Sequence, residues 1–272
     1  MLSWGAAFAQ TAPQGATSAP AQTAASTVQT DNGVNPTGLD FSVGVWVNPT
    51  FAGLVSRSGG NIINLASNLG FGNQTLVVPQ VSYRFNHGQI LSINYNDFNA
   101  TTQTVSPTNL SYSTVGFPAG TPITSNLQVQ WSDINYELPI YYDTYPPKNQ
   151  YLNVVLGAKI MRGTFQMTRF DGAVAAHEPI TEPFPLFGLD GEFRLGSGTS
   201  AHFKLTGIYG SLENAVGSSE DIQVGFTQKF FSGLSATADY RYWNFYEVIN
   251  HGTLNLFAFR LSGPQFSLDY KF

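Results

Sequence analysis

The stretch Gln265-Phe266-Ser267-Leu268-Asp269-Tyr270-Lys271-Phe272 alternates strictly between polar and apolar residues. Successive side chains of a β-strand point to opposite faces, so a strand here would have one apolar and one polar face. The apolar face would hold Phe266, Leu268, Tyr270 and Phe272. An apolar row that continues to a terminal residue gains little in a soluble sheet, whose ends usually fray. It suits the closing strand of a transmembrane barrel, which has lipid on one side and a polar lumen on the other.

The same period of two recurs along the chain from Leu39 onward. The other runs lie near residues 39–48, 77–85, 91–96, 127–142, 152–160, 187–195, 203–209, 222–230 and 236–242. Long polar stretches at 48–75 and 100–126 alternate with short turns at 86–88, 196–198 and 232–233, and Gly263-Pro264 reads as a bulge. The sequence predicts an all-β fold, a closed antiparallel up-and-down transmembrane barrel of about ten strands, with eight or twelve as alternatives.

The terminal aromatic strand and the alternating strands before it resemble the outer-membrane β-barrels of Gram-negative bacteria, of the OmpA and OmpW class. The resemblance implies a place in the outer membrane with both termini in the periplasm. It implies outer-membrane lipid and lipopolysaccharide as neighbours, and a barrel assembly machinery that reads Phe266, Leu268, Tyr270 and Phe272. We expect a monomer that serves as a structural barrel or a minor channel.

Composition excludes several other classes of function. Charged residues make up 11% of the chain, against about 25% in an average globular domain. A net charge of −5 argues against a nucleic-acid partner. The absence of Cys removes thiol catalysis and thiolate metal sites, and no His, Asp and Glu cluster has metal-ligand spacing. We therefore expect neither a metal nor a cofactor.

Three segments are expected along the chain. Residues 1–9 read as the remnant of a secretory signal peptide, because Ala7-Phe8-Ala9 has the small-x-small pattern of a cleavage site. Residues 10–38 are rich in Ala, Thr, Ser, Gln and Pro, and are predicted to form a flexible periplasmic tail. Residues 39–272 form the predicted barrel.

The polar rows of the strands carry both signs of charge in near balance. Burying an unpaired charge costs several kcal/mol, so a closed lumen requires this balance. The predicted lumen charge network consists of Asp40, Arg84, Asp133, Glu137, Lys159, Asp190, Glu192, Arg194, Lys204, Asp221, Lys229, Asp239 and Arg241.

Aromatic residues gather toward the two ends of the strands, as expected where a bilayer has two interfaces. The predicted belts contain Tyr83, Phe85, Tyr142, Tyr151 and Tyr270 near the short turns, and Trp46, Trp131 and Trp243 near the long loops. The alternative is that aromatics simply favour strands.

The predicted function is a structural barrel or a narrow channel for small solutes, with a polar lumen largely filled by side chains. The protein is not expected to be an enzyme. One alternative is an omptin-like hydrolase, in which His177 with Asp171 or His251 with Glu247 would act as base and orienter. Others are a surface adhesin that binds ligands through residues 101–126, and a soluble lipocalin-like or jelly-roll barrel with its apolar face inward.

Overall fold

A computed structural model describes residues 37–58, 60–142, 150–176, 180–212, 215–231, 233–250 and 254–272. The predicted signal remnant and almost all of the predicted tail lie outside these residues. Within them, no helix is long and apolar enough to cross a membrane.

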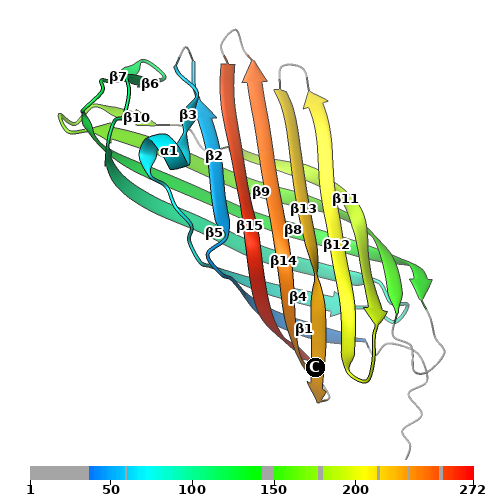
Figure 1. The fold of residues 1–272 in the computed structure, drawn as a ribbon. Coiled ribbons are helices and arrows are strands. Elements are labelled where there is room, and N and C mark those ends of the chain that lie inside the picture. Colours follow the sequence, from blue (N-terminus) through cyan, green and yellow to red (C-terminus); the bar gives the residue numbers. More distant parts are fainter. Residues whose placement is uncertain are drawn as a thin grey trace, which may run out of the picture. The chain divides into compact units, whose positions relative to one another are not determined.

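Ten long strands form a closed antiparallel barrel in which neighbours in sequence are neighbours in space (Figure 1). This confirms the predicted fold class and strand number. The strands are β1 (Gly38–Trp46), β4 (Leu76–Arg84), β5 (Ile90–Val105), β8 (Pro122–Tyr142), β9 (Tyr151–Arg169), β11 (Ile180–Arg194), β12 (Thr199–Leu212), β13 (Ala215–Phe231), β14 (Leu234–Asn250) and β15 (Leu254–Lys271).

The barrel closes between β15 and two segments of the N-terminal part. Residues 265–271 of β15 pair with β1, and residues 256–262 pair with β2 (Thr50–Ser56). β1 and β2 are separated by a kink at Asn48, whose positive φ of 39° is one that asparagine tolerates better than most residues. The predicted bulge at Gly263-Pro264 is wrong, because β15 pairs with β14 without interruption there. Gly263-Pro264 instead marks the point where β15 changes partner from β2 to β1.

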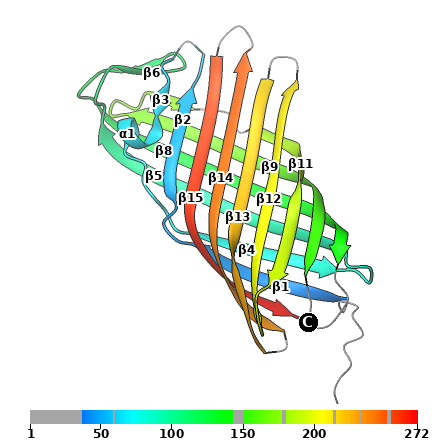
Figure 2. The ribbon, with the colours of Figure 1, turned by 45° about the vertical axis from the view of Figure 1, so that its right-hand side comes forward.

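The two stretches predicted to be long polar loops are folded segments. The first contains β2, β3 (Ile63–Asn64) and α1 (Leu65–Leu69), and the second contains the end of β5 and a hairpin of β6 (Leu110–Tyr112) and β7 (Val115–Phe117). β10 (Val174–Ala176) pairs antiparallel with residues 166–168 of β9 at the same end of the barrel. These small elements gather at the top of the ribbon, opposite the C-terminus (Figures 1 and 2).

Along part of β5 the barrel wall has no neighbouring strand on one side, and a short helix and side chains cover this gap, which we call the seam. β4 pairs with β5 only over Gln80–Arg84, so β5 beyond Asn94 has no ladder partner on that side. The helix α1 lies against both β2 and β5 and buries Leu65 and Leu69 there. Gln74 Nε2 donates to the carbonyl of Asn99 at 2.7 Å, which ties this cover to β5.

The strand β8 shows how the barrel divides into two halves. Apart from Ser125, its inward row is apolar from Ile123 to Trp131, it is polar from Asp133 to Glu137, and both parts are buried. Its outward row changes in the opposite sense, from Gln130 and Ser132 to exposed Ile134. We call the part on the Ile134 side, next to the short turns, the short-turn half, and the other part the long-loop half.

Outward side chains of the short-turn half form a continuous apolar band. Its exposed members include Phe41, Val43, Val77, Val81, Leu91, Ile93, Ile134, Tyr136, Leu156, Ile160, Phe187, Leu189, Leu205, Ile222, Val224, Phe226, Tyr240, Phe266 and Leu268. On β15 the band runs over Pro264–Phe272, close to the roughly 9–11 residues that a transmembrane strand needs. The band therefore has the composition and height of a lipid-facing surface.

The long-loop half has the opposite polarity. Its interior is one cluster of buried aromatic and aliphatic side chains, built around Phe51, Phe98 and Phe259, whose ring centroids lie 5.2–5.4 Å apart. Its outward row on β9 is polar, with Arg162, Thr164, Gln166 and Thr168. This half is built like a soluble protein, with its hydrophobic core inside.

Candidate functional site

The boundary between the two halves is a layer of three tryptophans inside the barrel. Trp46, Trp131 and Trp243 are almost completely buried, and the rings of Trp131 and Trp243 stack 4.0 Å apart with an interplanar angle of 13°. We call these three residues the aromatic layer. Since the apolar cluster continues beyond it, side chains fill the interior of the long-loop half.

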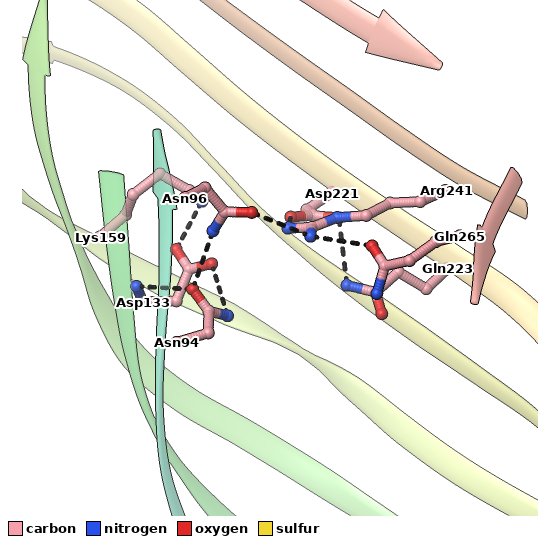
Figure 3. A network of polar contacts seen from close by, with 8 residues as sticks. All are labelled: Asn94, Asn96, Asp133, Lys159, Asp221, Gln223, Arg241 and Gln265. Carbon is pink, nitrogen blue, oxygen red and sulfur yellow. Dashed lines mark hydrogen bonds and ion pairs between the residues drawn. The ribbon is translucent and has the colours of Figure 1, made fainter. Parts of the chain in front are cut away.

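Below the aromatic layer lies a network of polar side chains that crosses the barrel (Figure 3). Arg241 binds Asp221 with two parallel hydrogen bonds, Nε to Oδ1 at 3.0 Å and Nη2 to Oδ2 at 2.6 Å. Lys159 Nζ lies 2.5 Å from Asp133 Oδ1. Both cations are within 1% of complete burial, so the two ion pairs compensate charges that water cannot reach.

Amide side chains join these two ion pairs into one network. Asn94 Nδ2 donates to Asp133 Oδ2 at 3.1 Å, and Asn96 Nδ2 donates to Asn94 Oδ1 at 3.1 Å. Arg241 Nη1 then donates to Asn96 Oδ1 and to Gln265 Oε1, each at 3.3 Å. The chain of contacts links β5, β8, β9, β13, β14 and β15, and it holds the cations in fixed positions.

The same cations also contact the aromatic layer. The guanidinium of Arg241 lies 4.8 Å from the ring centroid of Trp46, and Lys159 Nζ lies 5.5 Å from that of Trp243. Both distances are within the range of cation–π attraction, which is stronger where water is excluded. The polar network and the aromatic layer therefore stabilise each other across the boundary.

The rest of the short-turn half encloses a polar cavity of about 310 Å³, which we call the cup. Its inner end is formed by the polar network. Its open end lies at the short turns, where the side chains of Lys229 and Lys271 are nearly half exposed. The cup thus opens at one end of the barrel only, because the aromatic layer lies beyond its floor.

Ion pairs line the wall of the cup at several depths. Lys204 Nζ lies 2.7 Å from Glu137 Oε1 and 3.8 Å from Asp190 Oδ2, and His202 Nε2 lies 2.6 Å from Asp239 Oδ1. Closer to the opening, Lys229 is 3.7 Å from Glu192, and Lys271 is 3.9 Å from Asp40. Among the described residues no group of three or more His, Asp or Glu side chains is arranged to hold a metal ion.

Comparisons with known proteins bear on the fold. The outer-membrane protease OmpT from Escherichia coli is 11% identical, with a TM-score of 0.50, over 88% of this chain and 98% of that one. The translocator domain of the autotransporter NalP from Neisseria meningitidis is 12% identical, with a TM-score of 0.43, over 88% and 90%. Ail, the attachment invasion locus protein of Yersinia pestis, is 12% identical, with a TM-score of 0.35, over 88% and 100%. No family model and no curated protein matches the chain.

The fold is that of an outer-membrane β-barrel. At identities near 11% the likeness concerns the fold alone and carries no activity with it.

The outer-membrane-type barrel places most of the predicted charged residues around the cup. Lining it are Asp40, Arg84, Asp133, Glu137, Asp190, Glu192, Lys204, Asp221, Lys229 and Asp239. Lys159 and Arg241 lie buried at its floor. Arg194 differs, since it lies at the rim beside Gly198 and donates from Nε to the carbonyl of Gly196.

The predicted aromatic belts need correction. Trp46, Trp131 and Trp243 are buried inside the barrel, and Tyr151 lines the cup and donates to Asp190 Oδ1 at 3.4 Å. Each has the same parity along its strand as the charged residues beside it, such as Trp131 with Asp133, and this signal was available in the sequence. Tyr83, Phe85 and Tyr270 are exposed on the outside near the short turns, and the side chain of Tyr142 lies outside the described part.

Several residues of the site were missed by the sequence analysis. The amides Asn94, Asn96 and Gln265 in the floor network, and Asn135, Asp269 and Lys271 in the wall, have no distinctive motif. Their parity assigns them to the polar rows. Only the closed barrel brings rows from separate strands into contact.

Proposed function

We propose that this protein is a barrel of the bacterial outer membrane that does not conduct solutes from one end to the other. The apolar band supports insertion in a bilayer at the level of the short-turn half. The shared fold with outer-membrane proteins supports that membrane over others. Outer-membrane lipid and lipopolysaccharide would surround the band, and a monomer suffices because the band continues around the barrel.

The observation that carries the proposal is the filled interior above the cup. A barrel of eight to ten strands is about wide enough for side chains to fill, whereas open aqueous channels belong to larger barrels. Here Trp131 stacks on Trp243, and the apolar cluster behind them leaves the polar path without a continuation. This favours a structural barrel over the narrow channel that the sequence also allowed.

We further propose that the short-turn end, with the cup and the C-terminal strand, faces the periplasm. The long-loop half would then project from the cell as a folded head, whose outward row on β9 is polar. Phe266, Leu268, Tyr270 and Phe272 all point outward, which leaves this row accessible to an assembly machinery. Protease added to intact cells should cleave a site inserted in the hairpin of β6 and β7, and not one inserted at residues 86–88.

Reconstitution in planar bilayers tests the absence of conduction. We expect no stepwise current of nanosiemens size from the refolded full chain. Flotation of the protein with lipid vesicles in a density gradient shows separately that insertion succeeded. Nanosiemens steps from the unaltered protein would contradict the proposal. A shift in gel mobility on boiling serves as the control for a folded barrel.

We infer no catalytic role. His177 and His251, which the hydrolase alternative requires, lie outside the described residues. Asp171, the expected partner of His177, is instead bound to Arg169 Nε and Nη2 at 2.8 and 2.6 Å and to the amide of Ala173 at 3.1 Å. The unaltered protein and the variant with both histidines changed to Ala should both show only background peptidase activity. A measurable activity of the unaltered protein that the substitution abolishes would overturn this inference.

The adhesin alternative loses its original support. The segment 101–126 was expected to be a display loop, but Leu110, Tyr112 and Phe117 are buried in the apolar cluster. Arg169 Nη1 donates to the carbonyl of Gly116 at 2.9 Å and so fastens the hairpin to the barrel. The segment covers the core of the long-loop half.

A further inference from the structure

We propose that the cup binds a small zwitterion of the amino-acid class, with its ammonium group inward and its carboxylate toward Arg84. The proposal goes beyond the proposed function and does not depend on whether the barrel conducts. It rests on the enclosed volume, the distribution of charge with depth, and two buried polar atoms of opposite character that have no partner.

The cup has enough room for a small organic solute. Its volume of about 310 Å³ lies at the lower end of the roughly 300–1,000 Å³ of known ligand pockets. The floor network closes its inner end with ion pairs that already satisfy each other. A ligand would therefore meet the wall residues between the floor and the opening.

The wall carries more negative than positive charge. Glu137, Asp190, Asp239 and Asp269 line it, while Lys204 is the cation that contacts Glu137 and Asp190. His202 compensates Asp239 only when its imidazole is protonated. An ammonium group would offset this excess of negative charge, because opposite charges attract strongly in a space shielded from bulk water.

The second observation is an amide oxygen without a partner. Asn135 lines the cup and is 3% exposed, and its Oδ1 accepts no hydrogen bond within the described chain. A buried acceptor of this kind costs free energy unless a donor reaches it. Ammonium groups are donors only, so one placed in the wall layer would satisfy Asn135.

Near the opening the unpartnered atom is a donor. Nε of Arg84 is buried and donates to no atom of the described residues. The guanidinium presents a planar set of donors that suits a carboxylate. Arg84 pairs with Ile90 across β4 and β5, and Ile90 with Glu137 across β5 and β8, so Arg84 lies two strands from Glu137. The donor and the carboxylate therefore reach into the cup from separate strands, and a ligand that carries both charges can contact both.

Calorimetric titration of the refolded full chain in detergent tests the proposal with three probes of similar size. We expect L-alanine to bind saturably, and ethanolamine and propionate, which each carry one of the two charges, to bind at least about tenfold more weakly. Ethanolamine binding as tightly as L-alanine would overturn the zwitterion in favour of a plain cation site. Equal binding of propionate, or no binding of any probe, would also overturn it.

Two variants locate the site, and one variant serves as a control. Arg84→Gln and Asn135→Ala should each weaken L-alanine binding by about tenfold or more. Glu220→Gln removes an exposed carboxylate on the outside of β13 and should leave binding unchanged. The gel-mobility shift confirms that each variant is a folded barrel. Unchanged binding in both cup variants would exclude the cup as the site.

Discussion

The two halves of this barrel are built on opposite principles. In the short-turn half, apolar side chains face outward and charged ones face each other across the cup. In the long-loop half, aromatic side chains fill the interior and polar ones face outward. The change takes place within a few residues along β9, between Met161 and Lys159 on the inside and between Arg162 and Ile160 on the outside. The comparison teaches that one barrel wall can face lipid along one part of its length and water along another. This requires that its inner and outer faces change polarity at the same height.

The largest effect on the free energy of unfolding is expected for the buried ion pair of the short-turn half. Asp221→Ala removes the partner of Arg241 and leaves a guanidinium buried without compensation, which should cost toward the upper end of about 3–5 kcal/mol of unfolding free energy. Glu220→Ala, one residue away on the outer face of β13, should change it by less than about 0.5 kcal/mol. Urea unfolding in lipid vesicles measures both. Equal effects would mean that the ion pair is unimportant.

A somewhat smaller effect should separate the aromatic residues of the two halves. Phe98→Ala removes a ring that packs on Phe51 and Phe259, and it should cost about 3–4 kcal/mol through lost burial and a cavity. Phe226→Ala removes a ring that is exposed on the apolar band, and it should cost about 1 kcal/mol or less in detergent. Urea titration of both variants in detergent compares them. A larger loss for Phe226 would contradict the assignment of inside and outside.

Charge placed on the outside of β8 should define the edge of the apolar band. Ile134→Arg puts a charge where lipid is expected and should cost about 2–3 kcal/mol in a bilayer. Gln128→Arg, on the same face of the same strand in the long-loop half, should cost less than about 1 kcal/mol. Refolding yields and stabilities in vesicles provide the measurement. Two equal costs would place the membrane boundary elsewhere.

The smallest effect on stability is expected for the exposed ion pair between Arg169 and Asp171 in the long-loop half. Hydrogen bonds from Arg169 lower the pKa of the Asp171 carboxyl to about 2. A carboxyl with a lowered pKa stabilises the fold above its unfolded pKa near 4, and this contribution is lost as the pH falls through about 2. NMR titration of the side chain should give a midpoint near 2 in the unaltered protein and a higher one in Arg169→Met, which stays below the usual value because the amide of Ala173 still donates to the carboxylate. An unchanged midpoint would show that Arg169 is not the cause.

Much of the fold was predictable because every strand follows one rule, the alternation of side chains between its two faces. Alternation with period two identified ten strands and the outward faces of residues such as Phe266 and Leu268. The same rule applied to Trp46, Trp131 and Trp243 would have placed them inside with the charged rows. Grouping them by nearness to the strand ends was the error, since bulky aromatics at a strand end suit a membrane interface and a filled interior equally well.

Other features could not be predicted from any single strand. The folding of residues 48–75 and 100–126 at the long-loop end depends on the packing of Leu65, Tyr112 and Phe117 in an apolar cluster that several distant strands build together. The seam beside β5 arises because β4, with 9 residues, is shorter than β5, with 16, and the sequence of one strand does not show the length of its partner. The change of pairing partner along β15, from β2 to β1, likewise depends on the closing of the barrel.

The order of residues by itself determined which side chains share a face, because the alternation of a strand is local and leaves no choice. Tertiary structure alone decided which of those faces meet and at what height their polarity reverses. Closing the barrel sets Arg241 of β14 against Asn96 of β5 and stacks Trp131 of β8 on Trp243 of β14. Contacts between residues more than a hundred positions apart follow from the register of the whole sheet, which no strand specifies alone.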